Sequence, residues 1–314
     1  MNQRKLIQHG TSSLTVALPI RWIKTRNLVK GNPVFVHEEG NKLIISTDET
    51  VKIGRISVDV TDLDRTSILL YVQSLYRFGY DEIEVHFNKP TIIHHRTKKE
   101  TSVSSVIHQI INRCIGAEII EQTKNKIIIK HLTKESEDDF KVVLRRIMLL
   151  LKDVMVSFND GVKNNDKNIL ETIEEKHDTL NKFTNYCLRL LNKYGYPDVK
   201  QTSMYFHIIA SIDKVVDPIK YAARDFLEYN KKPKKETIEI LEQINKSIEL
   251  YYTLFYTFNI KTVNDLSDNR DYVKTVIDKN SDKIPGKELI IVTKIQQIQE
   301  LLLDLTEFRM GLEY

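Results

Sequence analysis

Residues 4–46 read RKLIQHGTSSLTVALPIRWIKTRNLVKGNPVFVHEEGNKLIIS, and apolar residues alternate with polar or small ones through much of this stretch. The alternation predicts three short strands, at residues 14–18, 34–36 and 43–45. Pro19 suits the first turn of a helix, so one or two helical turns are expected after it. Glu39-Gly40-Asn41 predicts the turn of a hairpin. A small β-module with one short helix therefore opens the chain.

Charge is distributed unevenly along the 314 residues, whose formal net charge is +4. Residues 1–37 contain no acidic residue but six basic ones, Arg4, Lys5, Arg21, Lys24, Arg26 and Lys30. Subtracting these six from the 47 Lys and Arg leaves 41, against 43 Asp and Glu. A segment of one charge sign at a terminus is typical of a protein that binds a polyanion. The alternative, a solvated basic tail, fits less well because the segment has a strand pattern.

The middle of the chain alternates predicted strands and helices, which is typical of a small α/β domain. Strands are expected at residues 53–60, 83–87, 117–121 and 126–129, with helices at residues 67–78 and 102–113. From about residue 135 the apolar spacing becomes helical. Six helices are expected, at residues 136–159, 167–195, 200–230, 235–259, 266–280 and 287–312. Two runs of three helices suggest a pair of three-helix bundles.

These patterns together predict an α+β multidomain protein with domains at residues 1–48, 49–133 and 134–314. No stretch approaches the roughly 20 apolar residues of a membrane span, and the N-terminus lacks a secretory signal pattern. The two cysteines, Cys114 and Cys187, support neither a disulfide framework nor a cysteine-rich metal site. Phosphate-binding glycine loops and nucleophile elbows are also absent. A cytoplasmic protein that is not an enzyme is therefore expected.

Four landmarks of the first 46 residues occur in a recognisable order: Val16-Ala17-Leu18-Pro19, the short helix, Lys30-Gly31 and Leu43-Ile44-Ile45. In this order the segment resembles the AbrB/SpoVT family of DNA-binding domains. The resemblance implies a swapped-hairpin β-barrel built by two chains, and so a homodimer that binds double-stranded DNA. A β-module of about 45 residues can hardly build a core alone, which agrees with this requirement.

The resemblance also implies which residues approach DNA. By position these are Arg4 and Lys5 before the first strand, Ser12 and Ser13 in the following loop, and Arg21 and Lys24 on the short helix. The family commonly has arginine in that loop, so serine there implies contact with phosphate more than reading of bases. The alternative is a barrel that serves only for dimerisation and has a basic surface.

Two acidic motifs lie on successive predicted helices, Glu174 with Asp178 and Asp213 with Asp217. With these motifs and the Ile115–Ile120 strand, residues 100–314 resemble the PhoU family of phosphate-uptake regulators in its archaeal-type arrangement with an N-terminal AbrB-like domain. The resemblance implies a metal cluster at the four carboxylates, where oxygen ligands favour Mg²⁺, Mn²⁺ or iron. The alternative is a solvated acidic face.

Helical geometry places Glu174 and Asp178 away from the apolar stripe, and Asp213 and Asp217 on its flank. Neither pair is therefore expected in a buried site. The last predicted helix lacks a second acidic pair of this kind, so at most one metal cluster is expected.

Three functions are consistent with these features. The first is a DNA-binding transcriptional regulator of phosphate homeostasis that senses through the helical region. The second is a PhoU-type adaptor that restrains the ATPase subunit of a phosphate transporter, with the β-module serving only for dimerisation. The third, an antitoxin-like DNA binder, leaves the long helical region without a role. The acid-free N-terminus favours the first.

Overall fold

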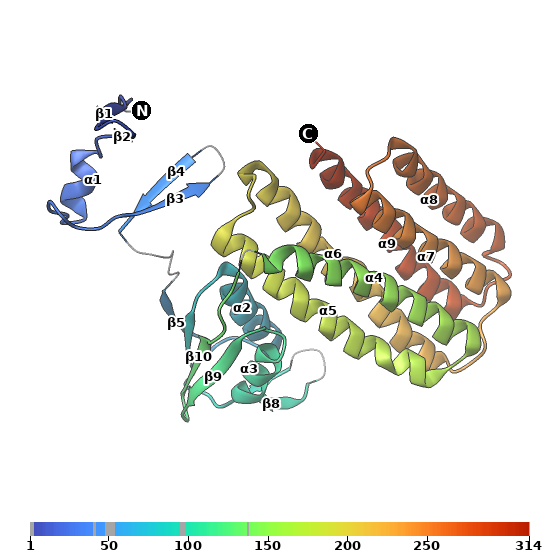
Figure 1. Ribbon diagram of the computed structural model, residues 1–314. Helices are drawn as coiled ribbons and strands as arrows, with labels where there is room; N and C mark the ends of the chain where they lie inside the picture. The colour runs from blue at the N-terminus through green and yellow to red at the C-terminus, as the bar shows by residue number, and fades with distance from the viewer. Residues whose placement is uncertain (1–2, 40–41, 48–53, 95–97, 137, 314) are drawn as a thin grey trace. The chain divides into compact units, whose positions relative to one another are not determined.

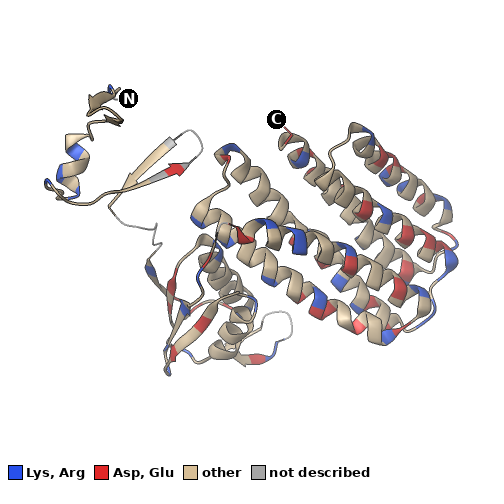
Figure 2. Cartoon of the chain, in the orientation of Figure 1, with Lys and Arg blue, Asp and Glu red and all other residues tan. Residues whose placement is uncertain are grey.

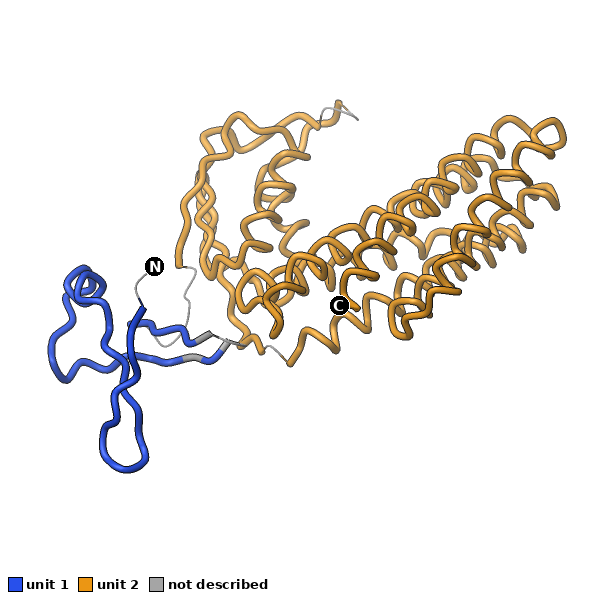
Figure 3. Tube along the Cα trace, turned by 90° about the horizontal axis from the view of Figure 1, so that it is seen from above, with its two compact units in different colours: residues 1–52 blue, residues 53–314 orange. Residues whose placement is uncertain are grey.

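The computed structural model describes residues 3–39, 42–47, 54–94, 98–136 and 138–313. The chain is mixed α+β, with small sheets followed by a long helical region (Figure 1). It divides into two compact units, residues 1–52 and residues 53–314 (Figure 3). Within the described residues, no helix combines the length and the apolar character that crossing a membrane requires.

The first unit consists of two hairpins and one short helix. Strand β1 (Ile7–His9) pairs with β2 (Ser13–Thr15), α1 (Ile20–Thr25) follows Pro19, and β3 (Phe35–Glu39) pairs with β4 (Lys42–Ser46). The predicted helix and second hairpin are confirmed. The turn residues Gly40 and Asn41 lie outside the described residues.

The two hairpins of this unit are separate two-stranded sheets. No described side chain in residues 3–47 is buried. Large apolar side chains are instead widely exposed, with Leu6 at 66%, Leu43 at 63% and Val29 at 70%. An isolated two-stranded hairpin is marginally stable in water. The first unit therefore lacks a hydrophobic core of its own within the described residues.

The second unit begins with a four-stranded sheet. The strand order is β5 (Arg55–Asp59), β6 (Glu82–His86), β10 (Lys126–His131) and β9 (Ala117–Gln122). Strands β5 and β6 are parallel, and the other pairs are antiparallel. The parallel pair is joined by a crossover helix, as this geometry requires. All four predicted strands and both predicted helices of this region are confirmed.

Helices α2 (Arg65–Phe78) and α3 (Val103–Ile111) share the core of this sheet region. The Asp64 side chain accepts a hydrogen bond from the Ser67 amide and caps the start of α2. Gly79 ends α2 in the left-handed conformation at φ 114°, which glycine adopts without steric cost. A hairpin of β7 (Thr91–Ile93) and β8 (Glu100–Ser102), not expected from the sequence, precedes α3.

Six helices follow, in the order α4 (Asp139–Asn164), α5 (Lys167–Tyr194), α6 (Val199–Tyr229), α7 (Lys235–Tyr256), α8 (Ile260–Asn280) and α9 (Gly286–Gly311). The six predicted helices are confirmed, with shifted ends. Helices α4–α6 pack together, as do α7–α9, and the two sets meet where α6 contacts α9 and α4 contacts α7. Their buried apolar side chains form one continuous core. Helix α5 also packs against α2, so the sheet region and the helices belong to one unit.

The expected end of the first long helix at residue 159, just before Gly161, is wrong, because α4 continues to Asn164. A Cβ at Gly161 would lie 2.8 Å from Leu170 Cδ2, so glycine here allows the close approach of α5. Glycine inside a helix costs about 1 kcal/mol relative to alanine, and the buried contact offsets that cost. The helix ends at Asn165, which adopts the left-handed conformation at φ 52°.

The start of α8 also differs from the sequence-based expectation. The helix begins at Ile260 and not at residue 266. The side chain of Asn259 accepts a hydrogen bond of 2.8 Å from the Lys261 amide, which caps the helix at this earlier point. The start of α8 is therefore determined by the Asn259 cap, which precedes the first regularly spaced apolar residues of the helix.

Candidate functional site

The six residues expected to contact DNA are all exposed in the first unit. Arg4 and Lys5 precede β1, and Ser12 lies in the turn of the first hairpin. Ser13 begins β2 and donates a hydrogen bond from its hydroxyl to the His9 carbonyl. This bond fixes the turn, and it commits the Ser13 proton to the backbone while leaving the hydroxyl oxygen free to accept.

The basic side chains of α1 share one helical face, since Arg21 and Lys24 are three residues apart. Figure 2 shows basic residues on this helix and no acidic residue. The salt bridges between described residues all lie between Arg55 and Glu313, so none neutralises a basic residue of this module. Arg4, Lys5, Arg21 and Lys24 are therefore available to an external anion.

The carboxylates of the two acidic motifs are paired with basic side chains of the same chain. Glu174 on α5 forms a two-pronged ion pair with Arg224 on α6, with Arg224 Nε 2.8 Å from a Glu174 carboxylate oxygen. Asp178 accepts from Arg113, which follows α3, at 2.7 Å. Asp213 on α6 lies 3.9 Å from Arg77 Nη2 of α2 and also accepts from the Asn181 amide at 2.8 Å. Each motif thus joins α5 to another element of the second unit.

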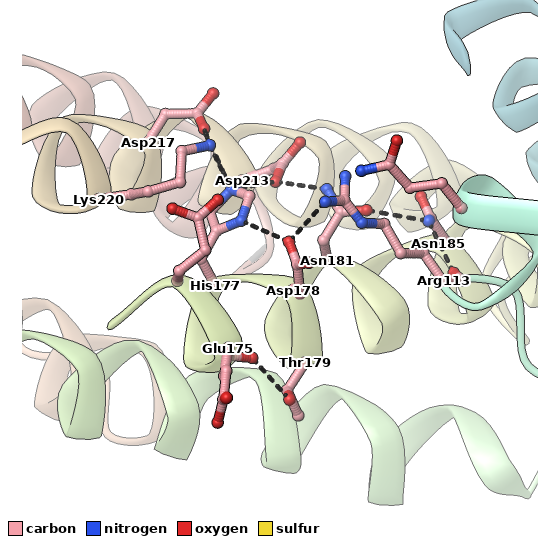
Figure 4. A network of polar contacts seen from close by, with 12 residues as sticks. Arg113, Glu175, His177, Asp178, Thr179, Asn181, Asn185, Asp213, Asp217 and Lys220 are labelled. Atoms are coloured by element: carbon pink, nitrogen blue, oxygen red, sulfur yellow. Dashed lines mark hydrogen bonds and ion pairs between the residues drawn. The ribbon is translucent and has the colours of Figure 1, made fainter. Parts of the chain in front are cut away.

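His177 lies at the centre of this arrangement (Figure 4). Its Nδ1 is 3.2 Å from Asp178 Oδ1, and its Nε2 is 3.1 Å from Asp217 Oδ1. Lys220 Nζ lies 2.6 Å from the same Asp217 oxygen and 3.1 Å from His177 Nε2. The carboxylate at each ring nitrogen favours a doubly protonated imidazole, whereas the Lys220 ammonium, which can only donate, opposes a proton on Nε2.

The pKa values of these groups follow from the geometry. Burial acts to lower the pKa of His177, but the hydrogen bonds to Asp178 and Asp217 outweigh burial and raise it. Burial acts to raise the pKa of both aspartates, yet hydrogen bonds from His177, with those from Lys220 to Asp217 and from Arg113 to Asp178, lower it overall. At neutral pH the Asp178 and Asp217 carboxylates are therefore charged, and the raised pKa of His177 favours its protonated form.

The α6 carboxylates are partly covered, although the helical pattern placed neither acidic pair in a buried site. The side chains of Asp213 and Asp217 are only 13% and 30% exposed. The reason is that residues on the flank of an apolar stripe are covered when a neighbouring helix supplies polar partners, here His177 and Asn181 of α5. In the sequence, the spacing of three residues between Asp217 and Lys220 indicated that these two side chains could form an ion pair.

A second polar cluster fixes α5 to the sheet region, and the sequence did not reveal it. Its centre is Arg189, whose side chain is fully buried. Arg189 donates to Glu135 at 2.5 Å and to Asp81 at 2.9 Å, and it also donates to the carbonyls of Tyr76 and Tyr80. Lys193 adds ion pairs to Asp81 and Glu135. All the charges of this cluster are compensated, as buried charges must be.

Among the described residues, no group of three or more His, Cys, Asp and Glu side chains is arranged to hold a metal ion. A metal held by Glu174, Asp178, Asp213 and Asp217 would have to displace the basic side chains that now contact them. The metal site stays a prediction, and the ion pairs determine how it can be tested.

Replacing Asp213 and Asp217 by Asn should lower the free energy of unfolding by about 2 kcal/mol or more, because the buried His177 and Lys220 would lose their charged partners. If the carboxylates also hold a metal, the same variant should lose it. Elemental analysis and urea unfolding of wild type and variant measure both effects. Asp278→Asn with Asp282→Asn is the matched control, an exposed acidic pair with the same spacing. Equal metal content in all three proteins would contradict the metal prediction.

No protein-family model matches the chain, and no curated protein sequence matches it.

Proposed function

We propose that the protein is a homodimeric DNA-binding transcriptional regulator of phosphate homeostasis. Residues 1–48 form the DNA-binding part, and the helical region is the part that senses. The observation that carries this proposal is that, within the described residues of the first unit, large apolar side chains are exposed and the basic side chains have no acidic partner.

The apolar side chains of the module support the dimer. Leu6 and Ile7 at the first hairpin, and Leu43 and Ile44 on β4, are each between 43% and 66% exposed. Contiguous exposed apolar surface marks an interaction site. Burying it contributes roughly 25 cal/mol per Å² of apolar area, which a second copy of the same module supplies symmetrically. Interleaving of the two hairpins from two chains would complete the sheets that each chain leaves two-stranded.

The basic side chains of the module support DNA as the partner. Arg21 and Lys24 on one face of α1, with Arg4 and Lys5 before β1, lack described acidic partners. Guanidinium and ammonium groups supply most of the sequence-independent affinity for a duplex by neutralising phosphates. A dimer doubles each of these contacts and matches the two-fold symmetry of a palindromic site.

We expect the full chain to be a stable dimer in solution, with twice the 36.7 kDa mass of one chain. A shortened chain of residues 53–314, which keeps its own core, should have the mass of a monomer. Light scattering at micromolar concentration measures both. A monomeric full chain would contradict the proposal at its first step.

The regulatory part of the proposal has its own test. Immunoprecipitation of the protein with its chromosomal DNA, followed by sequencing, should enrich fragments upstream of genes for phosphate uptake. Even coverage of the chromosome would mean that the protein binds DNA without regulating particular genes.

A second candidate function is the PhoU-type adaptor that docks on the ATPase subunit of a phosphate transporter. One observation favours it: α4 exposes Val142, Leu149 and Val156, which recur every seven residues on one face. Exposed apolar stripes of this kind suit a protein partner. In that case the first unit would serve only for dimerisation, and its basic side chains would not affect function.

A further inference from the structure

A cavity of about 390 Å³ opens at one end of the helical region. Helices α4, α6, α7 and α9 contribute to its lining, together with Tyr196 in the connection between α5 and α6. This end of the helices contains neither acidic motif, and the cavity includes none of the residues of the His177 cluster. Its chemistry therefore requires a separate explanation.

The charged side chains of the cavity are all positive. Lys141 and Arg145 on α4 and Arg309 on α9 line it, and none of the described lining residues is acidic. Two other cavities of the second unit differ, since one is lined by Asp265 and Asp268 with a single lysine, Lys246, and another contains acidic and basic residues in equal number. A concave surface of one charge sign concentrates ligands of the opposite sign. Glu313 pairs with Arg309 but does not line the cavity, so the lining keeps a net positive charge, which favours an anion.

Arg309 is held in place in the wall of the cavity by contacts within the chain. Its side chain is 11% exposed, Nε donates to the Phe255 carbonyl at 2.9 Å, and Nη1 pairs with Glu313 at 3.0 Å. Its guanidinium carbon lies 5.2 Å from the centre of the Phe258 ring. These contacts fix the plane of the guanidinium, while Nη2 has no described partner. Lys141 and Arg145 are exposed and have no described carboxylate partner, so they can close on a bound anion.

Aromatic rings form the rest of the wall. Phe140, Tyr196 and Tyr205 contact one another, with ring centres 4.3 to 5.6 Å apart. On the other side, Phe255 and Tyr256 meet edge to face at 5.1 Å. Burial raises the pKa of Tyr205 and Tyr256, so both rings stay neutral and add no negative charge. Rings of this kind offer stacking surfaces to a planar ligand.

We propose that this cavity binds a small phosphorylated ligand with a planar ring, of the nucleoside monophosphate class. Arg309, Arg145 and Lys141 contact the phosphate, for which guanidinium groups offer paired donors. The aromatic wall stacks on the base. The volume lies within the usual range of small-molecule sites, roughly 300–1,000 Å³. This inference does not depend on DNA binding by the first unit.

Isothermal titration calorimetry of the full chain with adenosine monophosphate, adenosine and inorganic phosphate tests the proposal. Adenosine monophosphate should bind with a dissociation constant at least tenfold lower than either fragment, because only the whole ligand uses both the cations and the rings. Arg145→Ala should weaken its binding about tenfold, which corresponds to about 1.4 kcal/mol. Tyr256→Ala should weaken the monophosphate and adenosine alike and leave inorganic phosphate unchanged.

Arg146→Ala is the matched control, since Arg146 is the next residue on α4, is also exposed, and does not line the cavity. It should bind adenosine monophosphate as wild type does. Absence of binding at millimolar ligand, or equal loss in Arg145→Ala and Arg146→Ala, would overturn the proposal. Inorganic phosphate binding as tightly as the monophosphate would overturn the role of the rings. Circular dichroism of each variant confirms that the helices remain folded.

Discussion

Replacing Arg189 by Ala should lower the free energy of unfolding of the second unit by about 3 kcal/mol. The side chain is fully buried and contacts Glu135, whose own side chain is 2% exposed. Removing the guanidinium leaves the buried Glu135 carboxylate with Lys193 and the His131 ring, at 2.7 and 3.2 Å, as its described basic partners. The carbonyls of Tyr76 and Tyr80 would also lose a donor. Since removing one partner of a buried ion pair costs about 3–5 kcal/mol, this substitution should be among the most destabilising single changes in the protein.

Arg224→Ala is the control for this prediction. It also removes an arginine from an ion pair with a glutamate, but the side chains of Arg224 and Glu174 are 48% and 45% exposed. Exposed pairs contribute about 0–1 kcal/mol. Urea unfolding followed by far-ultraviolet circular dichroism compares the two variants. If Arg189→Ala loses no more stability than Arg224→Ala, the cluster at Arg189 does not hold the sheet region against α5.

The regular elements of the protein follow from its apolar periodicity. The six long helices and the four-stranded sheet were predictable because each buries one face over many residues, and the pattern repeats in the sequence. Helix ends were less predictable, since they depend on single side chains. Gly161 is typical of a break but serves a close helix contact, and Asn259 caps a helix that the periodicity placed later.

The polar clusters depend on contacts between distant residues, which periodicity does not contain. The acidic residues Glu174, Asp178, Asp213 and Asp217 could be found from their spacing. Their partners could not, because Arg113 lies in another part of the chain and meets Asp178 only after α5 packs against the sheet region. Arg189 likewise looks like any exposed arginine in the sequence, and only the packing of α5 reveals that it is buried.

Replacing Arg21 and Lys24 by Ala should remove most of the salt dependence of DNA binding. In a dimer, Arg4, Arg21 and Lys24 would place about six positive charges near phosphates, so log K should fall with log salt at a slope of about −5. The double variant keeps about two of these charges, and its slope should be about −2. The affinity at low salt should fall with it, because the release of counterions drives binding. Fluorescence anisotropy of a labelled duplex across a salt series gives both quantities.

The matched control is Lys231→Ala with Lys232→Ala. These two exposed lysines lie between α6 and α7 in the second unit, and their loss changes the net charge of the chain by the same amount. The slope of this control should remain near that of the wild type. If both double variants show the same reduced slope, the overall charge of the protein and not the first unit governs binding.

The central claim is that the first unit is the DNA-binding part. The most direct test compares the full chain with residues 53–314 in the same anisotropy titration at one salt concentration. We predict that the full chain binds the duplex and that the shortened chain, which retains its own hydrophobic core, shows no binding at micromolar concentration. Equal affinity of the two proteins would contradict the claim and would leave the adaptor as the better-supported function.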